Sequence, residues 1–217
     1  MRKQPINLGT FEVISGVLRI SDPCYDKKTW CAGTVGHALE GTWKAQVIKD
    51  NDKQCRELVT VHSLHNKSKL KFKKLDINVG VDSGCAGIFD DRLYGKNFSD
   101  KQVLVGSQEY DQRQNDYIRL TNKKFYEHTI KFYKDASPPL KKYYQTMIDI
   151  YEKDNVKPKL RFSKKWNEVS SDPTFGNIGA GVIRNGVVSR SGDGDGSYVA
   201  YAAYDKKGRV VGVKIKF

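Results

Sequence analysis

Long apolar runs and the common catalytic signatures are both missing from this sequence of 217 residues. No stretch approaches the roughly 20 consecutive apolar residues of a membrane-spanning helix, and the first residues lack the apolar core of a signal peptide. The phosphate-binding pattern G-x-x-x-x-G-K, the nucleotide fingerprint G-x-G-x-x-G and the zinc motif H-E-x-x-H are also missing. We therefore expect a cytoplasmic protein without membrane contact, outside the common nucleotide-fold enzymes.

Cysteine is scarce, and its spacing argues against a metal or redox pair. The four cysteines are Cys24, Cys31, Cys55 and Cys85, and no two of them form a C-x-x-C pair. A chain of this length without an export signal rarely depends on disulfides, so we expect reduced thiols. A nucleophilic cysteine needs a base or a lowered pKa, and no histidine adjoins any of these cysteines in the sequence. We therefore assign no catalytic residue.

Acidic residues are outnumbered by basic ones. The sequence has 25 Asp and Glu against 38 Lys and Arg, which gives a formal net charge of +13. An excess of this size attracts anions at long range. The expected partner is an anionic small molecule or an acidic protein, with nucleic acid as an alternative. A lysine-rich composition that only decorates solvated faces explains the charge equally well.

Alternating apolar residues and turn signals predict a chain made mainly of antiparallel strands. One hairpin signal is the dipeptide Asn185-Gly186, and the chain ends in another hairpin around residues 205–208. Lysines at positions 67, 69, 71 and 73 lie on one face of a further predicted strand, a pattern that protects a sheet edge more often than it binds anions. The predicted strands are residues 11–20 with a bend at Gly16, 41–48, 56–62, 76–82, 85–89, 181–184, 186–189, 198–204 and 209–217.

The middle of the chain has a different periodicity. Residues 139–154 place apolar side chains at the i, i+3, i+4, i+7 spacing of a helix, and residues 121–135 are also expected to be helical. The predicted fold class is α+β, mainly antiparallel β, as a sandwich or open barrel. We expect one domain over residues 1–217, with residues 121–157 as a helical insertion.

Three segments rich in small residues carry aspartates next to predicted strands: Ser21–Asp26, Gly80–Gly87 and Gly186–Tyr198. Sites assembled from loops over a β scaffold are common, so we expect the three segments to meet at one end of the sheet. The candidate ligand-binding residues are Asp22, Cys24, Tyr25, Asp82, Ser83, Gly84, Asp193, Asp195, Gly196, Ser197 and Tyr198.

The loop with Asp193 and Asp195 allows three interpretations. Two carboxylates at i and i+2 suit a hard cation, but Ala202 stands where an EF-hand needs glutamate. The glycines could instead turn backbone N–H groups toward an anion. In the third interpretation, the segment is a tight turn whose aspartates cap its own amides.

The same segments carry a family resemblance. The stretches Asp22–Tyr25, Gly80–Asp90 and Gly186–Tyr198, closing on Gly208–Ile215, resemble bacterial and phage proteins of the domain-of-unknown-function 4241 family. The similar hallmarks are a V-D-S-G segment and a late G-D-G-x-Y segment, and the predicted helical insertion is not part of the likeness. The resemblance implies a compact β-rich domain of bacterial or phage origin and supplies no function. Phage proteins of this kind often counter host defences, an association that rests on no physical argument.

Two functions of different classes fit these observations. The first is a non-enzymatic binding protein that recognises an anionic ligand, either a nucleotide signal or an acidic partner, without a cofactor. It would act in the host cytoplasm if phage-encoded, as an anti-defence factor. The second is a hydrolase of nucleotides or phosphodiesters, in which Asp22, Asp82, Asp193 and Asp195 hold a divalent cation that activates water. We favour the binding protein because no candidate base or nucleophile has an evident partner in the sequence.

Overall fold

The computed structural model describes residues 5–98, 103–105 and 161–217, together with the single residues 127, 131, 133, 141 and 145. The chain divides into two compact units, one made of Met1–Val105 with Phe162–Phe217 and the other of Gly106–Arg161. The five single residues are helical. The remainder of the predicted helices, 121–135 and 139–154, lies outside the described residues.

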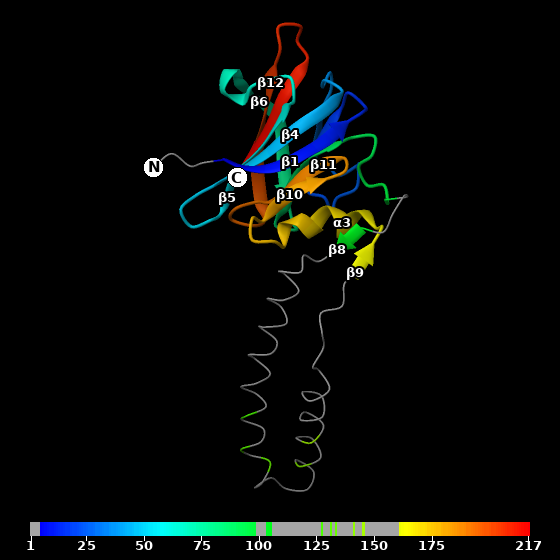
Figure 1. Ribbon diagram of the computed structural model, residues 1–217, viewed down its shortest axis with the longest axis vertical. Coiled ribbons are helices and arrows are strands. Elements are labelled where there is room, and N and C mark those ends of the chain that lie inside the picture. Colours follow the sequence, from blue (N-terminus) through cyan, green and yellow to red (C-terminus); the bar gives the residue numbers. More distant parts are fainter. Residues whose placement is uncertain are drawn as a thin grey trace. The chain divides into compact units, whose positions relative to one another are not determined.

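The first unit consists mainly of two antiparallel sheets, as the sequence predicts (Figure 1). One sheet has the strand order β1-β4-β5-β13-β12-β6, and the other has the order β10-β11-β7-β2-β3. The strands of the first sheet are β1 (Pro5–Val13), β4 (Gly41–Lys49), β5 (Cys55–His62), β13 (Val210–Lys216), β12 (Gly196–Tyr204) and β6 (Phe72–Val81). Those of the second are β10 (Ala180–Ile183), β11 (Gly186–Arg190), β7 (Cys85–Asp90), β2 (Leu18–Ser21) and β3 (Gly33–Val35).

Apolar side chains from both sheets form one core between them. Trp43 of β4, Ile88 of β7 and Ile215 of β13 are fully buried in this core. Burying such side chains is the main driving force of folding, at roughly 25 cal/mol per Å² of apolar surface. The arrangement is therefore a β-sandwich, one of the two architectures expected.

A short helix covers the outer face of the five-stranded sheet. This helix, α3 (Trp166–Ser171), presents Trp166 to Phe89 of β7 and to Tyr94, with ring centroids 5.3 and 4.9 Å away. The indole N–H of Trp166 donates to the carbonyl of Pro23 at 2.8 Å. The remaining short elements are η1 (Lys67–Lys69), η2 (Asp172–Thr174), β8 (Val103–Val105) and β9 (Arg161–Ser163), and the last two pair with each other.

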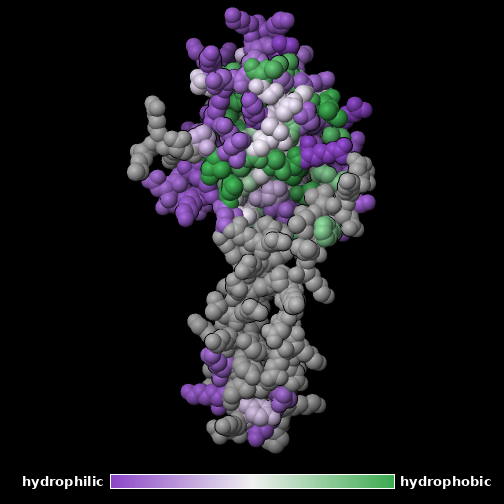
Figure 2. All heavy atoms as spheres, viewed as in Figure 1, coloured by the Kyte–Doolittle hydropathy of each residue, from purple (hydrophilic) through white to green (hydrophobic). Residues whose placement is uncertain are grey.

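The edges of the two sheets meet along a seam between β1 and β10. Partly buried Ile6, Leu8 and Val182 pack at this seam. Figure 2 shows apolar residues as a green band in the region where Figure 1 draws these strands. An edge strand covered in this way has fewer unpaired backbone groups to offer another chain.

The crossover from the first sheet to the second is held by a buried aspartate. Asp90, at the end of β7, is fully buried, and its Oδ2 accepts hydrogen bonds from the backbone N–H groups of Ile14 and Ser15 at 2.7 and 2.8 Å. These two residues lie in the link between β1 and β2, which belong to different sheets. A buried carboxylate is tolerated when its oxygens are hydrogen-bonded, so these hydrogen bonds allow Asp90 to fix the link.

Both C-terminal hairpins are present, but one turn is shifted. Ile183 pairs with Gly186, so the connecting residues are Arg184 and Asn185 rather than Asn185 and Gly186. A Cβ added to Gly186 would lie 2.5 Å from Cδ1 of Phe89. The glycine is therefore required by close packing against that ring, a constraint that the dipeptide signal cannot distinguish from a turn.

The last strand also departs slightly from the predicted alternation. Tyr204 pairs with Val210 while Ala203 pairs with Gly212, which leaves Val211 in a bulge. Val210 and Val213 consequently both join the central core. The bulge adds one residue to β13 and changes which side chains share a face.

The predicted lysine strand is wrong over its first half. Residues Lys67–Lys69 form a 3₁₀ turn, and β6 begins only at Phe72. Asn66 starts the turn, since its Oδ1 accepts from the backbone N–H of Ser68 at 3.0 Å. The prediction of a sheet edge is confirmed, because β6 is the last strand of its sheet and contains Lys73.

Replacing Gly87 should test the packing around Phe89. A Cβ added at Gly87 would lie 2.2 Å from Cζ of Phe89 and 2.6 Å from the carbonyl oxygen of Val187. We expect Gly87→Ala to lower the free energy of unfolding by about 2 kcal/mol, the usual cost of overpacking. Gly36→Ala is the matched control, because nothing lies within 4 Å of its added Cβ. Urea denaturation that ranks the two variants equally would contradict this packing.

Candidate functional site

The first of the three predicted segments centres on a second buried aspartate. Asp22 follows β2, is fully buried, and accepts four hydrogen bonds. Its Oδ2 accepts from the backbone N–H groups of Asp82 and Ser83 at 3.0 and 2.8 Å. Its Oδ1 accepts from the N–H of Cys24 and the hydroxyl of Ser83, both at 2.8 Å. The carboxylate is thus committed to bracing the link between β6 and β7.

The third segment joins the same cluster through backbone contacts. The N–H of Gly84 donates to Oδ1 of Asp195 at 3.0 Å, and the N–H of Ser191 donates to the carbonyl of Gly84 at 2.9 Å. Within the segment, the hydroxyl of Tyr198 donates to the carbonyl of Gly194 at 2.7 Å. The prediction that the three segments meet is confirmed by these hydrogen bonds. The role of their residues in binding a ligand stays a prediction.

The exposed carboxylates of this cluster do not converge on one point. Asp193 forms an ion pair with Arg56, whose Nη1 lies 2.8 Å from Oδ1, and Asp195 caps the amide of Gly84. Ser197 is the second residue of β12, and its hydroxyl donates to the side chain of Asn78. Among the residues that the structure describes, no group of three His, Cys, Asp or Glu is arranged to hold a metal ion.

The thiol and the phenol of the first segment are not activated. Partial burial raises the pKa of the Cys24 thiol, and the negative charge of Asp22 adds to the shift. Burial also raises the pKa of Tyr25, and its hydrogen bond with Asp82 acts in the same direction. A nucleophile or general base at neutral pH needs the opposite shift of a thiol or phenol. The cluster therefore offers bracing contacts rather than a reactive group.

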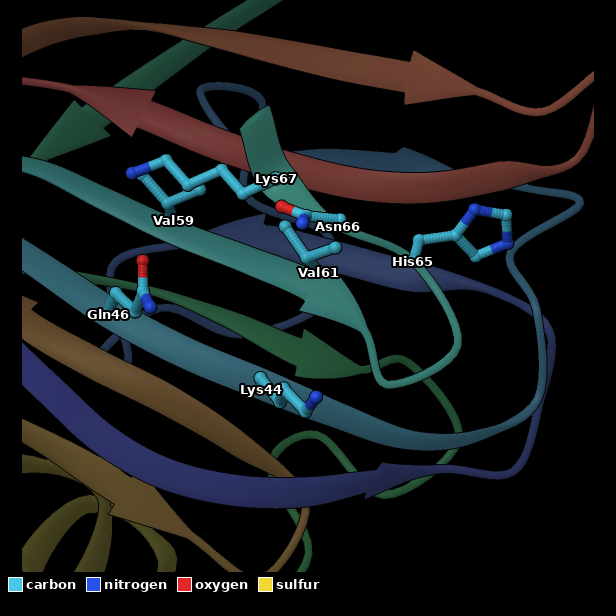
Figure 3. Close-up of a pocket in the computed structure, with 7 residues that line it drawn as sticks. All are labelled: Lys44, Gln46, Val59, Val61, His65, Asn66 and Lys67. Atoms are coloured by element: carbon cyan, nitrogen blue, oxygen red, sulfur yellow. The ribbon is translucent and has the colours of Figure 1, made fainter. Parts of the chain in front are cut away.

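A concave site lies elsewhere, on the outer face of the six-stranded sheet (Figure 3). Its floor is formed by Val59 and Val61 of β5. Both are buried, although the core between the sheets takes Leu58 of this strand and not these two valines. Its volume is about 310 Å³. The walls are polar or basic and come from β4 and from the segment after β5: Lys44, Gln46, His65, Asn66 and Lys67. We call this site the outer-sheet pocket.

The wall formed by the segment after β5 is held by the imidazole of His62. His62 is buried, its Nδ1 accepts from the N–H of Leu64 at 3.3 Å, and its Nε2 lies 3.1 Å from the carbonyl oxygen of Glu40. The ring therefore carries its proton on Nε2 and uses both nitrogens. The ammonium of Lys44 donates to the carbonyl of Ser63 at 3.3 Å, which ties β4 to the same segment. The pocket is preformed by contacts of the protein itself.

Positive charge dominates around the floor of the pocket. Burial lowers the pKa of Lys67, the carboxylate of Glu57 opposes that shift, and the ammonium of Lys214 adds to it. Lys214 lies directly opposite Val59 on β13, with its Nζ 3.9 Å from Glu57 and 4.9 Å from the ring centroid of Tyr201. The ammonium groups of Lys67 and Lys214 therefore share one carboxylate, that of Glu57, and Lys44 adds a third ammonium to the pocket wall. An anion bound here would relieve the repulsion between Lys67 and Lys214.

One feature of the sequence indicates that the outer face of β5 is covered, although the strands were predicted without using it. Residues Leu58–Val61 form a nearly continuous apolar run within β5. Such a run indicates a strand that is covered on both faces, whereas a sandwich strand with a solvated outer face alternates. The 3₁₀ turn that covers the outer face could not be identified, because its lysines have the alternation of a strand.

Comparison of the chain with profiles of known families, with curated proteins and with solved structures found no match. The resemblance to the domain-of-unknown-function 4241 family accordingly stays an expectation. In the described part of the chain, no helix has the length and apolar character needed to cross a membrane.

Substitution of Asp22 should show that it is a structural residue. Asp22→Asn keeps the shape but turns an NH₂ group toward amide or hydroxyl donors, so we expect the free energy of unfolding to fall by about 3 kcal/mol. Asp82→Asn is the control in the same cluster. Its side chain is exposed, and we expect a loss of about 0.5 kcal/mol or less. An Asp22→Asn variant as stable as the Asp82 control would mean that the carboxylate is not the brace described.

Proposed function

We propose that this protein is a non-enzymatic binding protein whose outer-sheet pocket holds a small anionic ligand of the nucleotide class. The observation that carries the proposal is the combination of an outward-facing apolar floor, Val59 and Val61, with the lysines around it. Ligand pockets are mostly concave and apolar, with a few polar groups that fix orientation. A nucleotide supplies both parts, since its base can cover the valines while its phosphates reach the lysines.

The charge of the whole chain favours the same class of ligand. A formal net charge of +13 raises the local concentration of anions and speeds their association. The two pocket lysines, Lys44 and Lys67, come from separate segments, so they can approach a phosphate from two sides. Gln46 and Asn66 add amide groups that can donate to phosphate oxygens or pair with a base.

A small nucleotide suits the pocket better than a nucleic-acid strand does. Strand binding without sequence preference uses successive aromatic side chains along a basic groove. On this face the rings of Phe72 and Tyr201 instead lie around the ammonium of Lys214, at 5.3 and 4.9 Å. The pocket is also small, with seven lining residues, all within β4, β5 and the segment after β5. We therefore place nucleic acid second.

We propose binding without turnover because the residues that line the pocket include no serine, threonine, cysteine, aspartate or glutamate to act as a nucleophile or to hold a catalytic metal ion. Sequestration of a nucleotide signal is a function that needs no catalytic residue. It is also the way in which a phage-encoded protein of this kind would counter a host defence, and we include that role in the proposal. The metal-dependent hydrolase is not favoured by the contacts of Asp22, whose carboxylate already accepts four hydrogen bonds.

Neutralising the pocket lysines should weaken nucleotide binding. We expect Lys44→Ala and Lys67→Ala each to raise the Kd of the best ligand from a panel of nucleotides about tenfold, equivalent to about 1.4 kcal/mol. Lys28→Ala is the control, because it removes the same charge from the exposed link between β2 and β3. Isothermal titration calorimetry gives the affinities, and chromatography after incubation with magnesium shows whether the nucleotide is recovered unchanged.

Two results would contradict the proposal. Equal losses in all three lysine variants would assign the effect to net charge rather than to the pocket, and appearance of a new product would make the protein an enzyme. A steep salt dependence with long single strands or duplexes, lost on neutralising the lysines, would make it a nucleic-acid binder.

The affinity should also depend on pH through Lys67. Because the pKa of Lys67 lies below its ordinary value of 10.5, its ammonium is lost at a lower pH than that of an exposed lysine. Only the charged form attracts a phosphate, so affinity should fall as the pH rises through this lowered pKa. Lys67→Arg stays charged over the whole range and should keep its affinity at alkaline pH. Identical pH profiles for wild type and Lys67→Arg would remove Lys67 from the site.

A further inference from the structure

The amide of Asn66, in the wall of the outer-sheet pocket, has a fixed orientation. Its Oδ1 accepts from the backbone N–H of Ser68 at 3.0 Å and from the hydroxyl of Ser68 at 2.9 Å. A backbone N–H can only donate, so the amide atom that receives it is the oxygen, and the NH₂ group lies on the other branch. These two bonds occupy both lone pairs of the oxygen and cap the 3₁₀ turn at Lys67–Lys69.

The side chain of Asn66 therefore offers a ligand donors only. Asn66 is exposed and lines the pocket (Figure 3), so its NH₂ group can be reached from solvent. The ammonium groups of Lys44 and Lys67 also carry donors and no acceptor. Gln46 can rotate its amide and His65 can change tautomer, so neither requires a donor or an acceptor of the ligand. Among the side chains that line the pocket, those with a fixed role are all donors.

A donor-only amide distinguishes between purine bases. An asparagine with a free oxygen pairs with adenine by accepting from its N6 amino group and donating to N7. Asn66 cannot form this pair, because its oxygen is bound to Ser68. Guanine and hypoxanthine carry a carbonyl oxygen, O6, in place of the amino group, and this acceptor matches an NH₂ group. An adenine amino group in the same place would bring two donors together and leave both unpaired.

We propose that the outer-sheet pocket selects 6-oxopurine nucleotides over adenine nucleotides, and that Asn66 determines the choice of base. This inference rests on the function proposed above and adds the class of base to it. The NH₂ group of Asn66 donates to O6, while the purine ring covers Val59 and Val61. The phosphate lies toward Lys44 and Lys67. Because Ser68 holds the amide before any ligand enters, little conformational entropy is lost when the contact forms.

A matched pair of ligands tests the base preference. Inosine 5′-monophosphate (IMP) has O6 where adenosine 5′-monophosphate (AMP) has an amino group, so wild type should bind IMP about fivefold more tightly in isothermal titration calorimetry. Asn66→Asp should reverse the preference. Its carboxylate can still accept from Ser68, but it presents an oxygen where the NH₂ group was. The added negative charge weakens every nucleotide, so the ratio of the two Kd values is the quantity to compare.

Asn51→Asp is the matched control, because it adds the same charge at an exposed residue of the turn between β4 and β5, outside the pocket lining. It should keep the preference for IMP. Asn66→Asp should also keep the Tm of wild type, since aspartate caps a turn as well as asparagine does. A reversed preference at an unchanged Tm assigns the effect to recognition of the base rather than to loss of the turn.

The failure of this inference can be told apart from the failure of the proposed function. Equal binding of IMP and AMP by wild type, or tighter binding of AMP, overturns the base preference. An Asn66→Asp variant that keeps the preference, or an Asn51→Asp variant that loses it, overturns the role of Asn66. In each of these cases, weaker binding by Lys44→Ala still supports the pocket as a nucleotide site. Absence of binding to both nucleotides, and to the wider panel, contradicts both proposals.

Discussion

Two buried aspartates hold the links between the sheets and so fix the frame of the sandwich. Asp90 binds two consecutive amides in the link from β1 to β2, and Asp22 binds two consecutive amides in the link from β6 to β7. In each case a carboxylate at the end of a strand in one sheet captures a link from the other sheet. Charge-assisted hydrogen bonds of this kind are stronger than neutral ones, and their loss would leave a buried charge uncompensated.

Because of these hydrogen bonds, the segments that stand out in the sequence are not the places where the structure has a pocket. The glycine-rich, aspartate-bearing segments stand out because the links need small residues and acceptors, and their polar groups are largely paired with one another. The outer-sheet pocket instead combines an apolar floor with lysines that come from separate segments, Lys44 and Lys67. Concave sites with apolar surface and a few polar groups are the usual places for a ligand.

The fold was more predictable than the site for a physical reason. Strand periodicity and hairpin turns are local, so both C-terminal hairpins followed from short stretches of sequence. The 3₁₀ turn at Lys67–Lys69 did not, because its capping by Asn66 resembles ordinary polar alternation. Gly186 was assigned to a turn, although its role is to let Phe89 approach. The approach of Lys44 to the segment after β5, which shapes the outer-sheet pocket, depends on tertiary contacts that no local pattern contains.

We propose that anions bind in the outer-sheet pocket and not at the braced loops. Differential chemical labelling tests it most directly, with an amine reagent for lysines and a carboxyl reagent for aspartates applied with and without the nucleotide that binds most tightly. We predict that mass spectrometry will show protection of Lys44 and Lys67, with Lys28, Asp82 and Asp193 labelled equally in both samples. Protection of Asp82 and Asp193, with Lys44 and Lys67 unchanged, would contradict the claim and return the site to the three loops.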